Sequence, residues 1–142
     1  MDTFNSLMLG FSVIFQPMNL LFCFWGVLIG TLVGVLPAIG VACSVALLLP
    51  ATFHMKPVSA IIMLSGLYYG AQYGGSTTSI LVKIPGEATS VMTCLDGYQM
   101  AKQGRAGPAL GIAAFGSFIA GTIGVLALMV LAPSLVRVAI KF

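Results

Sequence analysis

Residues 20–49 read LLFCFWGVLIGTLVGVLPAIGVACSVALLL and contain no charged side chain. A helix that crosses a membrane needs about 20 mostly apolar residues, and the first 17 residues of this stretch come close to that length. Pro37 then follows, flanked by Gly34 and Gly40. Proline removes a backbone donor and disfavours a continuing helix, and glycine lets the chain turn. The stretch therefore predicts a broken membrane segment over residues 20–53, rather than one smooth helix.

The composition of the whole chain extends this interpretation. Of its 142 residues, 59% are hydrophobic and 6% are charged, and the mean hydropathy is +1.10. Soluble domains carry about 25% charged residues. Three intervals of 53, 26 and 31 residues contain no charge at all, namely residues 3–55, 57–82 and 106–136. We therefore expect an all-α integral membrane protein that contacts the lipid bilayer.

The same composition excludes several classes of function. The net charge of +3 is spread over six basic residues and forms no patch for nucleic acid, and three cysteines make a disulfide framework improbable. His54 is the one histidine, and no Cys or carboxylate stands at metal-ligand spacing from it. The sequence has neither a Gly-x-Ser-x-Gly elbow nor a Gly-Lys-Ser/Thr phosphate loop. We therefore expect no enzyme activity and no cofactor.

The segments at either side of the centre are simpler. Apolar residues recur at helical spacing in residues 1–19, which predicts an amphipathic helix that ends near Pro17. Residues 88–106 form the longest polar stretch, and we expect a polar loop there with a short interfacial helix. Residues 107–136 are long enough to cross the membrane once as a helix. The placement of Lys and Arg leaves the orientation of the chain open.

Residues 57–87 begin with an apolar stretch, which is followed by a polar one. The stretch 68–79 reads YYGAQYGGSTTS, is polar and rich in glycine, and lies near the middle of the segment. Backbone that is not helical is tolerated at membrane depth only where it is buried in protein or lines a wet cavity. We therefore expect two short helices that meet at a glycine-rich tip, as in a re-entrant hairpin.

Three glycines, Gly26, Gly30 and Gly34, stand four residues apart in the first apolar piece and share one face of a helix. Small residues at this spacing let another helix approach closely, which is how helices associate in lipid. Glycine is also simply common in membrane helices. We favour close packing, and with 17 glycines in the chain we expect some of it to involve parts outside these residues.

Interrupted apolar segments rich in glycine and proline point to the binding site of a secondary transporter. A broken helix exposes amides that attract carboxylates, and carbonyls and hydroxyls that hold a cation such as sodium. The residues expected to contact a substrate are Gly74, Gly75, Ser76, Thr77 and Lys83. Those expected to hold the ion are Gly34, Pro37, Gly40, Thr78 and Ser79. The hydroxyls could equally serve only to satisfy backbone groups at a kink, and the residues alone leave both interpretations open.

Sodium is the coupling ion that the residues favour. A proton relay through a membrane needs Asp, Glu or His at depth, and the charge-free intervals contain none of these except His54 at the end of the first. Glu87 and Asp96 lie in or beside the polar loop, where they could titrate, so they are the weak point of this hypothesis.

Several motifs together resemble one known family. They are GVLIGTLVGVLP at residues 26–37, LLLPATF at 47–53, YYGAQYGGS at 68–76, IPGE at 84–87 and DGYQMAKQGR at 96–105. In this order they resemble the large membrane subunit of tripartite tricarboxylate transporters, the TctA family. One departure is Ala38-Ile39, where the family usually has Gly-Leu, and it affects the turn after Pro37 rather than the break itself.

The resemblance implies a multi-pass permease of the bacterial inner membrane. Such permeases take up citrate and other carboxylates with an ion gradient, commonly sodium. They work with a small membrane subunit and a periplasmic substrate-binding protein. Members of the family are several times longer than this chain, so the resemblance identifies it as an amino-terminal fragment.

The alternative from another class is a small, non-transporting membrane protein that packs against partners or assists assembly. The stretch 68–79 discriminates between the two, because a pure packing module has no need for four hydroxyls and paired glycines at the centre of an apolar segment. A re-entrant tip there favours a transporter, and an unbroken helix favours a packing module.

Overall fold

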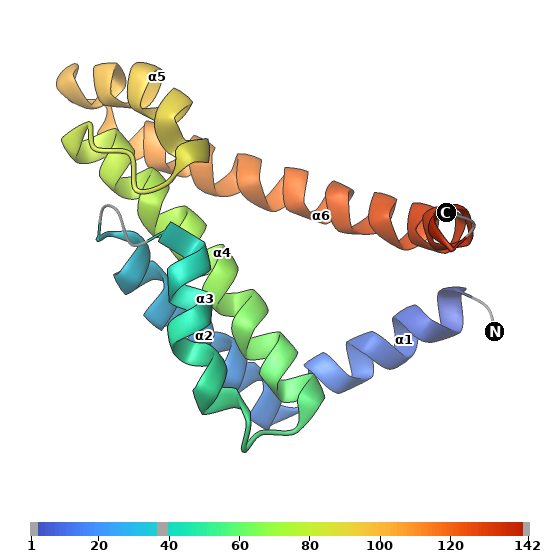
Figure 1. Cartoon of the computed structure of the whole chain (residues 1–142). Helices are drawn as coiled ribbons and strands as arrows, with labels where there is room; N and C mark the ends of the chain where they lie inside the picture. Colours follow the sequence, from blue (N-terminus) through green and yellow to red (C-terminus); the bar gives the residue numbers. More distant parts are fainter. Residues whose placement is uncertain (1–2, 37–39, 141–142) are drawn as a thin grey trace.

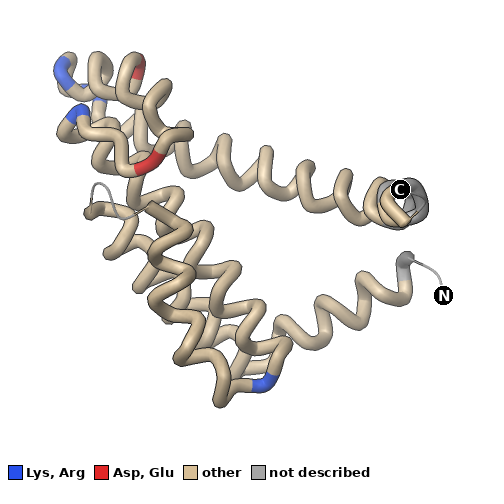
Figure 2. The backbone as a smooth tube through the Cα atoms, viewed as in Figure 1, with Lys and Arg blue, Asp and Glu red and all other residues tan. Residues whose placement is uncertain are grey.

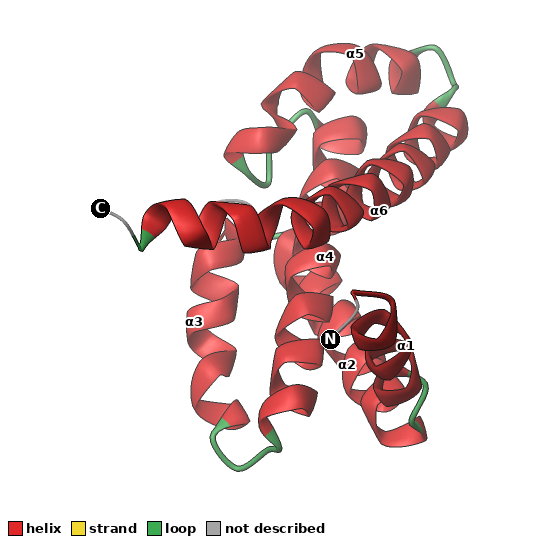
Figure 3. Ribbon diagram, turned by 90° about the vertical axis from the view of Figure 1, so that its right-hand side faces the viewer, coloured by secondary structure: helices red, strands yellow, loops and turns green. Residues whose placement is uncertain are grey.

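The computed structural model describes residues 3–36 and 40–140, and all regular structure in these ranges is helical (Figures 1 and 3). Side chains are described for these ranges without residues 3–4, 133–135 and 137–138. The elements in chain order are α1 (Thr3–Ile14), α2 (Pro17–Gly34), α3 (Gly40–Thr52), α4 (Pro57–Val82), the short 3₁₀ helix η1 (Ala88–Ser90), α5 (Val91–Lys102) and α6 (Ala106–Ala139).

The core of the structure is the contact between α2 and α4, which run parallel to each other. A Cβ atom added to Gly26, Gly30 or Gly34 would overlap the carbonyl oxygens of Met63, Leu67 and Ala71, in that order. The predicted close packing of the glycine face is therefore confirmed. Its partner lies within the chain, and the two backbones touch without intervening side chains.

The partner helix contributes glycines of its own to this contact. A Cβ on Gly66 would come within 2.8 Å of the Cys23 carbonyl oxygen, and one on Gly74 within 2.5 Å of the Thr31 carbonyl oxygen. Gly70 meets Val27 between them in the same way. Leu67 and Ala71 are fully buried in this contact, so apolar packing and close backbone approach act together.

The expected tip of a re-entrant hairpin in residues 68–79 is wrong, because α4 runs through this stretch as one unbroken helix from Pro57 to Val82. Two physical reasons account for this. The glycines of α4 are needed for its contact with α2, and helical backbone is what makes them face that helix. The chain instead reverses at Lys83, which follows the helix in a left-handed conformation with φ of 61°.

The helix does stop where the sequence predicts it, between Gly34 and Gly40. α2 ends at Gly34, and α3 begins at Gly40, which has a φ of 66° that suits glycine. Pro37, one of the predicted ion-binding residues, lies outside the described residues. α3 then returns antiparallel to α2 and lies against α4 (Figure 3).

Two of the described helices are long and apolar enough to cross a membrane: Pro17–Gly34 and Ala106–Ala132. The two helices are selected by length and composition alone. Their presence agrees with the expected class, an all-helical membrane protein. α4 is longer than α2 but less apolar, because its second half carries the polar stretch 68–79.

Residues 88–106, expected to be a polar loop with a short interfacial helix, are helical over most of their length. They contain η1 and α5, and α5 lies across the end of α4 (Figure 1). Gly97 of α5 faces Ile80 of α4, which is almost fully buried. α6 then leaves this end as a long helix whose apolar side chains are mostly exposed.

Among residues 5–132, the charged positions along the backbone lie toward the two ends of α4 (Figure 2). Lys56 precedes its start, and Lys83 follows its end. A helix of 26 residues is about 39 Å long, so these two lysines are far apart. The unbroken helix therefore does not bring Lys56 and Lys83 together, as a re-entrant segment would have done.

Candidate functional site

Four hydroxyl side chains follow Gly75 on α4, at the centre of the predicted site. Each donates a hydrogen bond to a carbonyl of its own helix, about one turn back. The distances to the carbonyl oxygens are 3.1 Å from Ser76 to Gln72, 2.9 Å from Thr77 to Tyr73, 3.2 Å from Thr78 to Gly74 and 2.8 Å from Ser79 to Gly75. The hydroxyls thus serve backbone groups, and each oxygen keeps capacity to accept a further bond or to bind a cation.

Lys83 is placed away from these hydroxyls. Its exposed side chain holds Nζ 5.8 Å from the centre of the Tyr98 ring on α5, and Nζ of Lys102 lies over the same ring at 5.2 Å. The structure therefore does not bring Lys83 together with Gly74–Thr77. It places Lys83 with Lys102 in a basic pair at the end of α4.

The predicted ion-binding glycine Gly34 does meet the predicted substrate-binding glycine Gly74. A Cβ on Gly74 would lie 3.0 Å from both the Gly34 carbonyl carbon and the Val35 nitrogen. Gly40 begins the next helix and has open space around its Cα. The end of α2 and the second half of α4 are thus neighbours.

A third stretch joins them, the loop of residues 83–87 after α4. Gly86 packs against the Cα of Gly75, and a Cβ on Gly86 would lie 2.9 Å from the Gly34 carbonyl oxygen. The chain has therefore returned from Lys83 by about two helical turns, to the level of Gly75. Three glycines from three elements (Gly34, Gly75 and Gly86) meet here, and we call their meeting point the glycine junction.

Glu87 lies beside the glycine junction, with its Cγ 3.5 Å from where a Cβ on Gly75 would be. Its Oε1 atom is buried and has no hydrogen-bond partner among the described residues. Burial raises the pKa of the Glu87 carboxyl, while the backbone N–H of Val41 at the start of α3 acts in the opposite direction. The carboxylate therefore faces the first turn of the helix that begins at the break.

The described residues offer no ordinary metal site. No group of three or more His, Cys, Asp or Glu side chains in this part of the chain is placed to hold a metal ion. A sodium site does not need three such side chains. Carbonyl and hydroxyl oxygens are sufficient ligands for sodium, and one carboxylate adds negative charge. The oxygens around the glycine junction are of these kinds.

Comparison with known proteins assigns the chain to a protein family. Residues 20–142 match the model of the tripartite tricarboxylate transporter TctA family. The chain belongs to this family. Over its full 142 residues, the chain is 58% identical to an uncharacterized 52.8 kDa protein from the TAR-I ttuC' 3' region of Agrobacterium vitis. The aligned part is 28% of the length of that relative. No solved structure matches the chain.

Membership of the TctA family confirms the resemblance that the sequence motifs indicate. TctA proteins are membrane proteins of a transporter family and not enzymes. The candidate spans α2 and α6 agree with this class. The conclusion from composition, that the chain belongs in a membrane, therefore has a second, independent basis.

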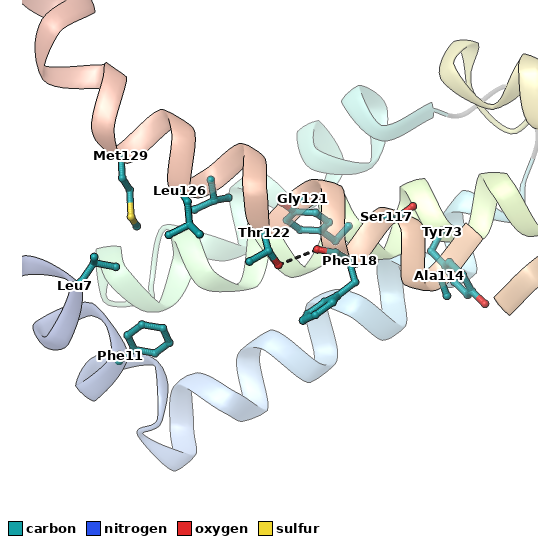
Figure 4. Close-up of a pocket in the computed structure, with 12 residues that line it drawn as sticks. Leu7, Phe11, Tyr73, Ala114, Ser117, Phe118, Gly121, Thr122, Leu126 and Met129 are labelled. Carbon is teal, nitrogen blue, oxygen red and sulfur yellow. Dashed lines mark hydrogen bonds between the residues drawn. The ribbon is translucent and has the colours of Figure 1, made fainter. Parts of the chain in front are cut away.

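An apolar pocket in the described part of this TctA chain lies away from the glycine junction. It has a volume of about 680 Å³ and lies between α1, α4 and α6 (Figure 4). Its lining residues are Leu7, Phe11, Tyr69, Tyr73, Ala114, Ser117, Phe118, Gly121, Thr122, Val125, Leu126 and Met129. The Thr122 hydroxyl already donates to the Phe118 carbonyl, at 2.8 Å. With no charged residue in its lining, this cavity suits apolar groups and not a carboxylate.

The sequence did not place Gly86 at the candidate site, and it indicated Glu87 only as a carboxylate that could titrate beside the polar loop. The available signal was the order Pro85-Gly86-Glu87 between two apolar stretches, which sets a carboxylate directly after turn-forming residues. Nothing in that order indicates that the turn lies back against Gly75.

Proposed function

We propose that the chain is part of the permease subunit of a tripartite system that takes up tricarboxylates such as citrate, or related carboxylates, across the bacterial inner membrane. A small membrane subunit and a periplasmic substrate-binding protein complete this system, and sodium is its coupling ion. The observation that carries the proposal is the family match over residues 20–142. Because the chain spans 28% of its curated relative, the activity, substrate and partners of the whole transporter are part of the proposal.

The helix break is the part of the proposed permease that meets the substrate. The start of α3 has backbone amides that favour a negative charge, and it lies where α2 has just ended. The proposed substrate contacts on α4 are Gly74, Gly75, Ser76 and Thr77. Lys83 and Lys102 add positive charge at the end of the same helix and attract an anion toward it.

Sodium is proposed to bind on the other side of the same break. Gly34 offers a carbonyl oxygen there, and Thr78 and Ser79 offer hydroxyl oxygens one turn beyond the glycine junction. The carbonyl oxygen of Gly40, the other predicted ion-binding glycine, already accepts a hydrogen bond from the Ser44 hydroxyl at 2.8 Å. Pro37, the remaining predicted ion-binding residue, lies in the sequence between these two glycines, outside the described residues. The buried, unpartnered Oε1 of Glu87 supports a cation here, because a buried carboxylate oxygen without a partner is costly.

One observation favours the second candidate function, a membrane packing or assembly protein. α4 is unbroken, and its glycines make backbone contact with α2, as expected of a packing module. We rank it second because the family is one of transporters.

Uptake into proteoliposomes tests the proposal. A transport-competent permease that contains this segment is reconstituted with the small membrane subunit, and labelled citrate is added with the binding protein. We expect uptake that needs all three components, with labelled glucose as the control that stays outside. Correct insertion without uptake of citrate or any other carboxylate in a panel would overturn the proposal and favour a packing protein. Residues 1–142 alone should be inactive, because α6 then exposes most of its apolar surface.

A further inference from the structure

We propose that Glu87 is a ligand of the coupling sodium ion, and that this ion couples to the anionic substrate by neutralising Glu87 at the start of α3. The inference rests on the proposed function and names a residue and a charge relationship that the function does not require.

The Glu87 carboxylate has an oxygen without a hydrogen-bond partner in the described part of the chain. Among the described side chains that are not exposed, Oε1 of Glu87 is the buried polar atom without a hydrogen-bond partner. A carboxylate oxygen in this position needs a proton, a donor or a cation. No Lys or Arg whose side chain the structure describes supplies one. Lys83 and Lys102 lie over Tyr98, and Lys56 is at the far end of α4. Arg105, just before α6, is exposed.

The backbone of Glu87 is held on two sides. Gly86 is in backbone contact with Gly75 and Gly34 on one side. On the other side, the Glu87 N–H donates to Ser90 Oγ at 3.2 Å, and Ser90 Oγ donates to the Glu87 carbonyl oxygen at 2.9 Å. The Ser90 side chain is itself buried. The backbone of Glu87 is thus fixed, which limits the positions that its carboxylate can take.

The Glu87 carboxylate lies between two helix ends of opposite polarity. α2 ends at Gly34 with its negative end, which favours a cation, and α3 begins at Gly40 with its positive end, which favours an anion. The carboxylate faces the Val41 N–H of this positive end. No charged side chain from α2 or α3 shares the site in the described residues, and Asp96 of α5 is exposed.

Coupling follows from these charges. Without a cation, Glu87 occupies the positive end of α3 and repels a substrate carboxylate. With sodium bound, the charge of Glu87 is cancelled, and the start of α3 is free to attract the substrate. A cation that raises substrate affinity in this way must, by reciprocity, itself bind more tightly in the presence of substrate.

Replacement of the carboxylate tests the inference. Glu87→Gln keeps the shape and removes the charge, Glu87→Asp keeps the charge on a shorter side chain, and Asp96→Asn removes an exposed charge as the matched control. Two quantities are measured on the purified, full-length permease: the sodium-induced shift of Tm without substrate, and the sodium concentration that gives half-maximal citrate binding.

For Glu87→Gln we expect the sodium-induced shift of Tm to be lost and citrate binding to become largely independent of sodium. Glu87→Asp should keep a response, with the half-maximal sodium concentration raised by roughly tenfold, the scale of a weakened charged contact. Asp96→Asn should behave as the unaltered protein does. A Glu87→Gln protein with unchanged sodium responses, or one in which citrate binding is lost at every sodium concentration, would overturn the inference.

The two proposals fail in different ways. If the unaltered permease binds no carboxylate, the proposed function fails, while the sodium-induced shift of Tm still reports on Glu87. If the permease takes up citrate with sodium and Glu87→Gln does so with the same sodium dependence, the inference alone fails. Should Glu87→Gln not fold, the Glu87→Asp variant decides, because unchanged sodium affinity in it would contradict the assignment.

Discussion

Gly86 lies in backbone contact with Gly75, and the Cα of Gly75 occupies the space that a Cβ on Gly86 would need. The contact joins the loop after α4 to the helix itself at the level where α2 ends. It fixes the position of Glu87, the next residue. The two glycines are not equivalent, because a Cβ on Gly75 would meet its neighbours at 3.5 Å or more, which is ordinary van der Waals contact.

Gly86→Ala should therefore destabilise the protein, and Gly75→Ala should not. The methyl group at residue 86 meets backbone, which cannot move aside as a side chain can, so we expect a loss of about 1–3 kcal/mol. Alanine at residue 75 gains helix propensity worth up to about 1 kcal/mol. The Tm values of the two variants in detergent check this, and equal losses in both would contradict the packing at the glycine junction.

The contact between α2 and α4 can be tested in the same way. Gly30→Ala places a methyl group against the Leu67 carbonyl, which is held inside α4. We expect a loss of about 1–3 kcal/mol from overpacking and a lower Tm. Gly10→Ala is the matched control, because residue 10 is also helical and nothing lies within 4 Å of its would-be Cβ. A lower Tm for Gly10→Ala alone would show that the two helices do not meet as described.

The sequence predicts the parts of this fold that depend on local chemistry. Pro37 between two glycines marks the end of α2, and the spacing of Gly26, Gly30 and Gly34 marks a packing face. The partner of that face and its parallel direction depend on contacts between distant residues. One signal for the partner was present, since Gly66, Gly70 and Gly74 repeat the spacing of four.

The prediction of a re-entrant tip in residues 68–79 is wrong for a physical reason. The glycines and hydroxyls of this stretch are typical of broken backbone, but the hydroxyls bond to carbonyls of their own helix and the glycines admit α2. Both roles need an intact helix. Glu87 could be predicted only as a carboxylate beside a polar loop, because the burial of its Oε1 depends on how the loop folds back.

Stability should depend on pH through Glu87, which lies outside the two candidate spans. Burial raises its pKa above the ordinary value of 4.5, so the folded protein binds this proton more tightly than the unfolded protein does. The resulting stabilisation is fully present below the ordinary pKa and is lost as the pH rises through the raised one.

In sodium-free buffer, Glu87→Gln should therefore lose less Tm than the unaltered protein between acidic and neutral pH. Asp96→Asn serves as the control and should keep the slope of the unaltered protein. If Glu87→Gln loses as much Tm over this range as the unaltered protein, Glu87 is not the group responsible.

The basic pair of Lys83 and Lys102 should assist the arrival of the anion. Lys83→Gln should raise the KM for citrate roughly two- to fivefold at low salt, with little change in kcat, because it weakens attraction over a distance. The effect should shrink at high salt, where charges are screened. Lys56→Gln, at the opposite end of α4, is the control and should leave KM unchanged. An effect of Lys83→Gln that persists at high salt would indicate direct contact with the substrate instead.

The coupling ion tests the central claim most directly, because the end of α2, the hydroxyls of Thr78 and Ser79, and Glu87 are all assigned to sodium. Citrate uptake is measured in proteoliposomes at fixed membrane potential, with the binding protein present, sodium replaced by choline, and external pH varied. We predict that uptake is lost in choline at every pH and returns when sodium is added. Full uptake in choline that follows the proton gradient would contradict the account.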